Sequence, residues 1–437
     1  MMVPTRRTLL LFAGLAPLAL LGYATLLALD MLIVVNVVLA LLVVIDGRLA
    51  TPPAALRLAR KGPDSFSVGR STEYTYCWEN PGRRPARLVV REARPSLLGG
   101  VAPPRNLWVA ARGTLRETLA VTPLRRGRET AGWLAVRSQG PLGLAFRQGR
   151  VELPWTATVY PTLPASRLKA SIAEAVRWKE SGLRSLRQLG EGRQFESLRE
   201  WVAGDDTRHI DWKATARRHK LIARQYEEER RQQVMLVIDG GRLLTADVGG
   251  RSRIEFVVES ALWLAFAANY HDDDVGVMVF SDEIHHYVVP RRGRRGLREV
   301  LEVLAVVEPR MVEPDYSAAF RYLAIRNRKR TLTVFFTDVI DRFASEALVG
   351  NVASLSPRHL PLVITLRNPE LDRVATVRPT TVSEAYRKAA AEELIRARNE
   401  ALSGMRRSGA VVLDSHPAHA SSAVVSRYLD LKRRGML

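Results

Sequence analysis

The stretch "VMLVIDG", Val234–Gly240, decides the fold of the C-terminal half of this chain. It is an uninterrupted apolar run that ends in a carboxylate. Apolar runs without polar alternation are typical of strands that are buried on both faces of a parallel sheet. The same pattern recurs further along the chain, at Asp274–Asp282, Thr331–Asp338 and Leu360–Leu366. We therefore predict a sheet whose central strands are parallel.

Segments with helical periodicity separate these strands, beginning with "RIEFVVESALWLAFAANY", Arg253–Tyr270. Further helices are expected at "GLREVLEVLAVV", "YSAAFRYLAIRNR", "TVSEAYRKAAAEELIRARNEALSG" and "HASSAVVSRYLDLKRR", and a last strand at "GAVVLDS". In the fourth helical segment, acids come early, bases come late and Gly404 lies near the expected end. "IHHYVVP", Ile284–Pro290, is the expected hairpin partner of the second strand. Alternating strands and helices predict a doubly wound α/β domain over 233–437.

Two of the predicted strands end in aspartates, Asp239 and Asp338, and ligands of doubly wound sheets bind at this edge. The pattern resembles a von Willebrand factor type A domain, whose metal site uses D-x-S-x-S on one loop, a Thr on a second and an Asp on a third. In this chain Gly241 and Leu243 stand where the serines belong, and Pro314 stands at the Thr place. The resemblance therefore implies a type A-like fold with a degenerate metal site.

Two carboxylates, Asp239 and Asp338, remain of the five expected metal ligands, whereas a hard divalent cation takes about six oxygen ligands. Arg242, close to the site in sequence, would oppose a cation. We expect no cofactor and no bound divalent cation. The alternative is a metal-dependent ligand-binding module that uses the two aspartates.

The N-terminal region is expected to be a membrane anchor, domain 1–50, because Asp30 is the only charged residue from Leu9 to Ile45. That stretch is too long for one upright span and suits a hairpin of two helices, roughly Leu9–Leu21 and Met31–Ile45, with the turn in Gly22–Asp30. The alternative is a cleaved signal peptide.

Basic residues flank the apolar stretch on both sides, at Arg6, Arg7, Arg48, Arg57, Arg60 and Lys61. Positive charge is retained in the cytoplasm, so we expect both termini and the soluble domains on the cytoplasmic side of the cell (inner) membrane. A single cysteine, Cys77, fits a reducing compartment.

The composition is that of a globular protein, with 25% charged and 47% hydrophobic residues, which excludes wholesale disorder. The net charge of +21 favours nucleic acid or an anionic membrane surface as a partner. Short β-rich segments with Gly and Pro punctuation, among them "STEYTYCWEN" and "ARLVVREA", predict a small sandwich-like domain over 51–165. Nothing in this domain has catalytic spacing, and a spacer role is expected.

The connecting segment, 166–232, carries the most unusual motif, "GEGRQFESLREWVAGDDTRHIDWKATARRHKLIARQYEEE", Gly190–Glu229. It closely resembles the central signature of the domain of unknown function 58 family. Trp201 stands where that family often has Tyr, and His209 stands where Arg is common. The signature positions singled out are Arg199, Trp201, Gly204, Asp205, Asp206, Arg208, Asp211, Trp212, Lys213 and Arg217.

Three hypotheses compete for this signature. A hydrolase would use Asp206, His209 and Asp211, but the surrounding arginines and lysines favour ion pairing over acid–base catalysis. Direct nucleic-acid binding is not expected, because a run of glutamates interrupts the basic tract. The favoured hypothesis is a structural joint, in which Arg–Glu pairs and two buried anchors, Trp201 and Trp212, hold the segment to the α/β domain.

The family resemblance also implies partners, since such proteins are commonly encoded beside a MoxR-type AAA+ ATPase and other type A-domain proteins. The chain is therefore expected to be no enzyme but a bacterial, membrane-anchored interaction or assembly factor that works with that ATPase and contacts the lipid bilayer.

Overall fold

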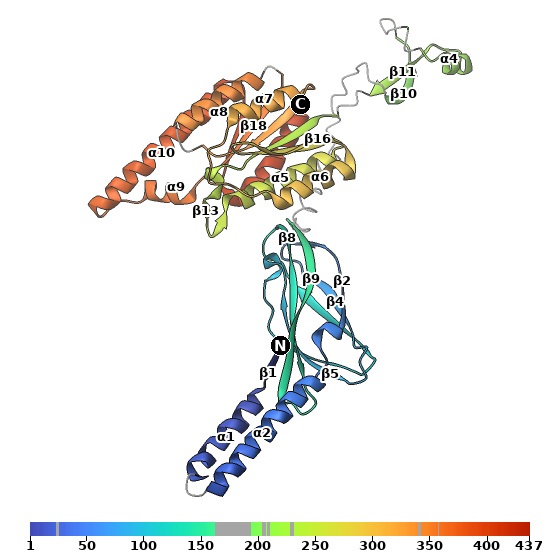
Figure 1. Ribbon diagram of the computed structural model, residues 1–437. Helices are drawn as coiled ribbons and strands as arrows, with labels where there is room; N and C mark the ends of the chain where they lie inside the picture. Colours follow the sequence, from blue (N-terminus) through green and yellow to red (C-terminus); the bar gives the residue numbers. More distant parts are fainter. Residues whose placement is uncertain are drawn as a thin grey trace. The chain divides into compact units, whose positions relative to one another are not determined.

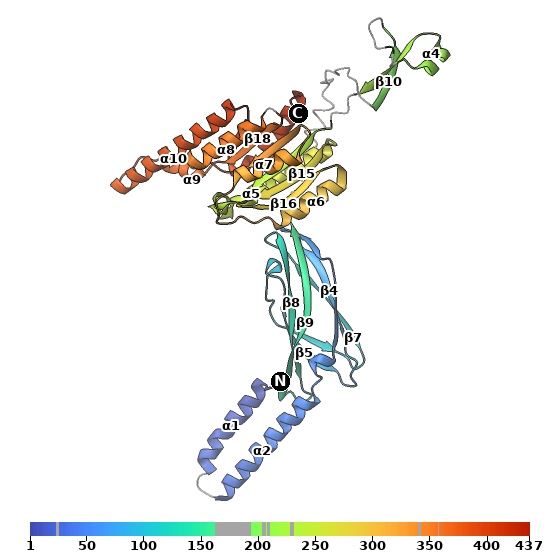
Figure 2. The same ribbon diagram turned by 45° about the horizontal axis from the view of Figure 1, so that its top comes forward.

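The computed structural model describes residues 1–22, 26–161, 194–202, 207, 210–227, 231–339, 342–356 and 358–437. The chain divides into two units, Met1–Thr162 and Leu163–Leu437. Figure 1 labels their helices and strands, and Figure 2 shows the same ribbon turned by 45°.

Two helices open the first unit, α1 (Arg6–Gly22) and α2 (Leu26–Leu49), and they lie side by side in both views (Figures 1 and 2). The predicted turn region was too long: α2 begins at Leu26, because its first residues, "LLALD", contain nothing that breaks a helix. Among the described residues, one helical stretch, Asp30–Ala55, is long and apolar enough to cross a membrane (26 residues, mean hydropathy 2.4). The 17 residues of α1 span only about 25 Å.

The helix pair is joined to the sheets of the same unit by backbone pairing and a buried carboxylate. Strand β1 (Met2–Pro4) precedes α1 and pairs antiparallel with the start of β9 (Ala145–Tyr160). Asp46, near the end of α2, is fully buried and accepts hydrogen bonds from the backbone N–H groups of Leu142, Leu144 and Ala145 at 2.7, 2.7 and 2.9 Å. The ends of both helices are therefore held by one loop of the sheet region.

The remainder of the first unit consists of two sheets around one core, as the β-rich sequence predicted. One sheet has the order β1-β9-β8-β5-β6, with β3 also paired to β9, and the other has the order β2-β4-β7. Aromatic side chains from both sheets, including Tyr76, Trp78 and Trp155, fill the core. The strands are β2 (Arg57–Lys61), β3 (Ser65–Ser67), β4 (Thr72–Glu79), β5 (Ala86–Ala93), β6 (Arg105–Val109), β7 (Thr114–Val121) and β8 (Gly127–Gln139).

The α/β part of the second unit has a six-stranded sheet of order β16-β15-β12-β17-β18-β19, parallel except for the edge strand β16. The predicted buried strands and the antiparallel hairpin partner are confirmed. One face packs against α5, α6 and α11, and the other packs against α7, α8 and α10. The strands are β12 (Gln233–Asp239), β15 (Asp274–Phe280), β16 (Ile284–Arg291), β17 (Thr331–Phe336), β18 (Leu360–Leu366) and β19 (Val411–Ser415).

The helices of this part are α5 (Arg253–Tyr270), α6 (Gly293–Val306), α7 (Tyr316–Arg326), α8 (Arg342–Leu355), α9 (Pro369–Thr376), α10 (Val382–Arg407) and α11 (Ala420–Arg433). α8 and α9 were not predicted. α10 continues past Gly404, and the chain turns instead at Gly409, whose φ of 88° is accessible to glycine at little cost.

The described part of the signature forms a small hairpin with a helix. β10 (Gln194–Glu200) pairs antiparallel with β11 (Ile222–Glu227), and α4 (Trp212–Arg218) lies between them in sequence.

Candidate functional site

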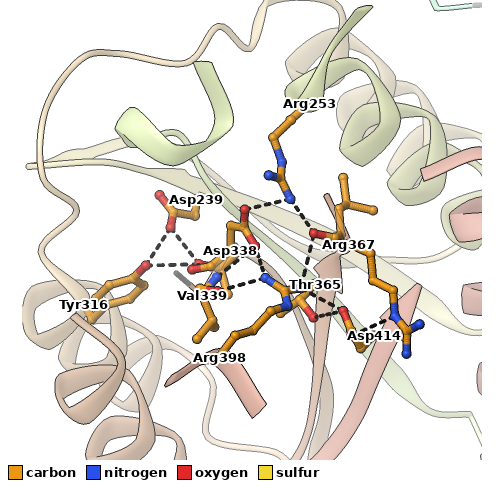
Figure 3. Close-up of polar contacts among 11 residues, drawn as sticks. Asp239, Arg253, Tyr316, Asp338, Val339, Thr365, Arg367, Arg398 and Asp414 are labelled. Atoms are coloured by element: carbon orange, nitrogen blue, oxygen red, sulfur yellow. Dashed lines mark hydrogen bonds and ion pairs between the residues drawn. The ribbon is translucent and has the colours of Figure 1, made fainter. Parts of the chain in front are cut away.

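Asp239 ends β12 and Asp338 follows β17, and because these strands are neighbours in a parallel sheet, both carboxylates lie at the same sheet edge (Figure 3). Both residues are almost fully buried, with exposed fractions of 2% and 3%. A buried carboxylate must be satisfied by hydrogen bonds or by opposite charge. The groups that satisfy these two therefore determine what the site can bind.

Asp239 is satisfied by neutral donors from its own domain. Its Oδ1 accepts from the Gly241 N–H at 2.8 Å, and its Oδ2 accepts from the hydroxyls of Tyr316 at 2.7 Å and Thr337 at 2.8 Å. Burial raises the pKa of Asp239, although these hydrogen bonds act in the opposite direction. Burial and the neighbouring Asp239 also raise the pKa of Tyr316 well above its usual value, so its hydroxyl stays a donor.

Asp338 is held between two arginines. Its Oδ1 accepts from the Arg398 Nη1 at 2.7 Å and from the Val339 N–H at 2.9 Å. Its Oδ2 lies 2.7 Å from the Arg253 Nη2, whose hydrogen bond is directed to the carbonyl of Leu366. Both guanidinium groups are largely buried, with side-chain exposures of 2% for Arg253 and 13% for Arg398. Two positively charged guanidinium groups therefore lie beside this carboxylate.

Arg398 extends the network to a third carboxylate. Its Nη2 donates to Asp414 Oδ1 at 2.7 Å, and Arg367 donates to the other oxygen of Asp414 at 3.1 Å. Burial alone would lower the pKa of Arg398, but Asp338 and Asp414 outweigh it and raise that pKa. The arginine therefore remains charged, and we refer to Asp338, Arg253, Arg398 and Asp414 as the arginine–aspartate cluster (Figure 3).

Sequence reasoning found Asp239 and Asp338 but missed Tyr316, Arg253, Arg398 and Asp414. Asp414 carried a usable signal, since it lies near the end of a strand as the other two aspartates do. Arg253 and Arg398 carried none, because they reach Asp338 from residues that are distant in sequence. Arg242, which we expected to oppose a cation, instead pairs with Glu313 on the surface.

The arrangement does not fit a divalent cation of the kind that an intact type A metal site holds. A Cβ at Gly241, where a serine ligand would begin, would lie 2.9 Å from Pro314 Cδ and 3.0 Å from Asp239 Oδ1. The hydroxyls of Tyr316 and Thr337 already donate to Asp239, and two arginines already offset the charge of Asp338. A cation would have to displace these donors and lie beside two guanidinium groups.

We expect millimolar magnesium, manganese or calcium to leave the melting temperature of the full chain unchanged. A site filled a hundredfold above its dissociation constant would add about 2.7 kcal/mol to the free energy of unfolding. Thermal unfolding in detergent, with and without chelator, measures this. A rise in melting temperature that Asp239→Asn abolishes would contradict the expectation.

The signature residues are only partly described by the structure. Gly204, Asp205, Asp206, Arg208 and His209 lie outside the described residues, and two of them, Asp206 and His209, belong to the hydrolase hypothesis. The backbone of Arg199 pairs with Ala223 in the β10–β11 hairpin. Lys213 and Arg217 are exposed on α4.

Asp211 and Trp212 differ from the roles that the joint hypothesis gave them. Asp211 is the N-cap of α4 and accepts from the Ala214 N–H at 3.0 Å, which satisfies a free donor of the first turn. Trp212 was predicted to be a buried anchor. This is wrong, because Trp212 is the first residue of α4, directly after the N-cap, and is 68% exposed. Trp201 is half-buried, and its backbone N–H donates to Leu221.

Trp212→Ala should therefore cost less than about 1 kcal/mol of unfolding free energy, rather than the roughly 3–5 kcal/mol typical of a buried tryptophan. Trp263→Ala is the matched control, since Trp263 is 5% exposed. Urea unfolding of both variants measures the difference. Equal losses would show that Trp212 is buried after all.

Comparisons with known proteins agree with the sequence signature. Residues 197–402 match a family model described as "Protein of unknown function DUF58". Uncharacterized proteins of Mycobacterium bovis and Mycobacterium tuberculosis are each 24% identical to this chain over 263 residues, covering 57% of it and 82% of the relative.

Solved structures show only weak similarity. A CARDB domain from Pyrococcus furiosus, solved in complex with di-metal ions, is 19% identical with a TM-score of 0.18, and the match covers 24% of this chain and 86% of that one. Proximal thread matrix protein 1 from mussel byssus is 11% identical with a TM-score of 0.28, and the match covers 46% of each chain. Neither match bears on the function of this chain.

Proposed function

Because the chain belongs to the DUF58 family through residues 197–402, we propose that it is a membrane-anchored interaction or assembly factor without enzymatic activity. The observation that carries the proposal is that the chain's own groups already occupy both carboxylates: neutral donors bond Asp239, and two arginines pair with Asp338. An α/β domain normally uses this sheet edge for ligand chemistry. Here both carboxylates at this edge are bonded by groups of the same domain, and this arrangement supports a role in contacts with other proteins rather than in ligand chemistry.

Attachment to a membrane is supported by the surface of α1 and α2. Large apolar side chains are exposed along both helices, among them Leu9, Leu10, Val34, Val38 and Leu41. Exposed apolar surface of this extent requires a partner, and a lipid bilayer is the partner that suits long apolar helices.

A hairpin arrangement is supported by the pairing of β1 with β9. Residues before α1 and residues after α2 share one sheet, so both lie on the same side of any bilayer that the two helices enter. The flanking arginines support a cytoplasmic location for that side.

An AAA+ ATPase of the MoxR type is the partner that the family resemblance implies, together with other type A-domain proteins. A protein partner suits the basic but mixed surface of the described residues, where cations alternate with carboxylates in pairs such as Arg295–Glu299 and Arg298–Glu302. Such alternation does not make the continuous phosphate track that nucleic acid requires.

We expect a reporter fused after Leu437 to be active in the cytoplasm, and the full chain to stay with the membrane after a high-salt wash. Salt does not release a protein that is held in the membrane by the apolar surface of α2, whereas it screens and weakens a purely electrostatic attachment. Crosslinking in intact membranes followed by purification identifies the protein partner. Periplasmic reporter activity would overturn the proposed orientation, and recovery of no ATPase would overturn the proposed partnership.

A further inference from the structure

A cavity of about 150 Å³ lies beside the arginine–aspartate cluster, and three arginines line it: Arg253, Arg367 and Arg398. They come from the start of α5, the end of β18 and the middle of α10, so the fold brings them together from distant parts of the domain. Figure 3 shows Arg367 and Arg398 at Asp414 and Arg253 at Asp338.

Two donors in this wall are buried and lack an acceptor among the described residues, namely the Nε–H groups of Arg253 and Arg398. Each buried donor without a partner costs about 1–3 kcal/mol. The terminal nitrogens of these arginines are already used by Asp338, Asp414 and the Leu366 carbonyl. These two Nε–H groups are unused but closed off from solvent, so an acceptor that enters the cavity first meets the exposed Arg367.

The third arginine, Arg367, has terminal N–H groups that are not used in its contact with Asp414. Arg367 is 56% exposed and uses only its Nε in the contact with Asp414. Asp414 itself is satisfied on both oxygens by Arg398, Thr365 and Arg367, so its charge is offset. The lining itself holds three guanidinium groups and two carboxylates, Asp414 and the exposed Asp372, and Asp338 pairs with Arg253 and Arg398 beside it.

The size and the apolar part of the lining narrow the class of ligand. About 150 Å³ is smaller than the 300–1,000 Å³ of a typical small-molecule site, so only the end of a molecule can enter. Val339, Leu371, Leu394 and Ile395 supply apolar wall beside the arginines. Planar guanidinium groups match a planar carboxylate, and the exposed Asp372 opposes a doubly charged phosphate more strongly than a singly charged carboxylate.

We propose that this cavity binds a carboxylate on a short aliphatic stem, held by Arg253, Arg367 and Arg398. Such a group is presented by a glutamate or aspartate side chain of another protein and by a free short-chain acid. The site is independent of the membrane anchor and of the ATPase partner, so it stands or falls separately from the proposed function.

Calorimetric titration of the full chain in detergent tests the proposal with four probes: the peptide acetyl-Ala-Glu-Ala-amide, its glutamine counterpart, propionate and inorganic phosphate. We expect the glutamate peptide to bind at least tenfold more tightly than the glutamine peptide, which corresponds to about 1.4 kcal/mol. Propionate binding as tightly as the peptide would identify a free acid as the ligand, and peptide binding alone would identify a protein side chain. Equal binding of the two peptides, or preference for phosphate, would overturn the proposal.

Two variants at the cavity and one outside it locate the binding. Arg367→Gln removes the exposed guanidinium, and Asn399→Asp adds a carboxylate to the lining without changing side-chain size. Each should weaken binding of the glutamate peptide about tenfold. Arg396→Gln, on the same helix but outside this cavity, should leave it unchanged. Binding that survives both cavity variants would overturn the proposal, and unchanged melting temperatures confirm that the variants fold.

Discussion

Replacing Asp338 with asparagine should lower the free energy of unfolding of the α/β domain by about 3–5 kcal/mol. Asp338 offsets the charge of Arg253 and Arg398, and its side chain is fully buried, as is that of Arg253. The asparagine amide keeps the shape but leaves two positive groups in a low-dielectric site with only Asp414 as a counter-charge. Breaking a buried ion pair by removing one partner is costly for this reason.

Urea unfolding of the full chain, followed by circular dichroism, measures this loss. Asp372→Asn is the matched control, because Asp372 lies on the same cavity but is exposed, and its replacement should cost less than about 0.5 kcal/mol. Combining Asp338→Asn with Arg253→Met should recover part of the stability, since the second change removes the uncompensated charge. A loss below about 1 kcal/mol for Asp338→Asn would show that the arginines are satisfied without it.

Replacing Asp46 with alanine should destabilise the first unit by about 3 kcal/mol or more. The carboxylate accepts backbone N–H groups from Leu142 and Leu144 in the loop between β8 and β9 and from Ala145 at the start of β9. All three would lose their partner; the buried Ala145 donor alone would cost about 1–3 kcal/mol, and the two half-buried donors would add to this. The loop packs closely around this side chain, because a Cβ placed at Gly140 would overlap the Asp46 carboxyl group.

Limited proteolysis in detergent micelles measures this second effect, because release of the loop exposes residues near Leu142 to cleavage. Asp64→Asn is the control, since Asp64 is 78% exposed and makes only a 3.9 Å contact with Arg60. Equal protection of the Asp46→Ala variant and the wild type would contradict the prediction. Gly140→Ala should reproduce the effect, because its methyl group would displace the carboxylate.

Both predicted losses of stability come from removing a buried carboxylate. The sequence indicates the position of one of these carboxylates but not the role of the other. Asp338 ends a predicted strand, and its position at the sheet edge follows from strand polarity alone. Asp46 follows an apolar helical stretch and gave no sign that it would cap a loop almost a hundred residues away. Local sequence patterns therefore located one carboxylate and were silent on the other.

The signature shows a second limit of the local patterns. Its acids, bases and tryptophans suggested ion pairs and buried anchors, yet Asp211 caps a helix and Trp212 points to solvent in the described structure. The local sequence around Asp211 and Trp212 is the same whether the tryptophan is buried or exposed. Its burial depends on what packs against the helix.

By itself the sequence determined the parallel α/β sheet, the β-rich region before it, the apolar N-terminal helices and the two aspartates at the strand ends. Hydrophobic periodicity and strand polarity are local properties, so they survive without knowledge of contacts. Only the tertiary structure decided what those aspartates do. Arg253 and Arg398 reach Asp338 from α5 and α10, and Tyr316 reaches Asp239 from α7. The partners of a buried charge are set by packing between elements distant in sequence, and no local pattern encodes that choice.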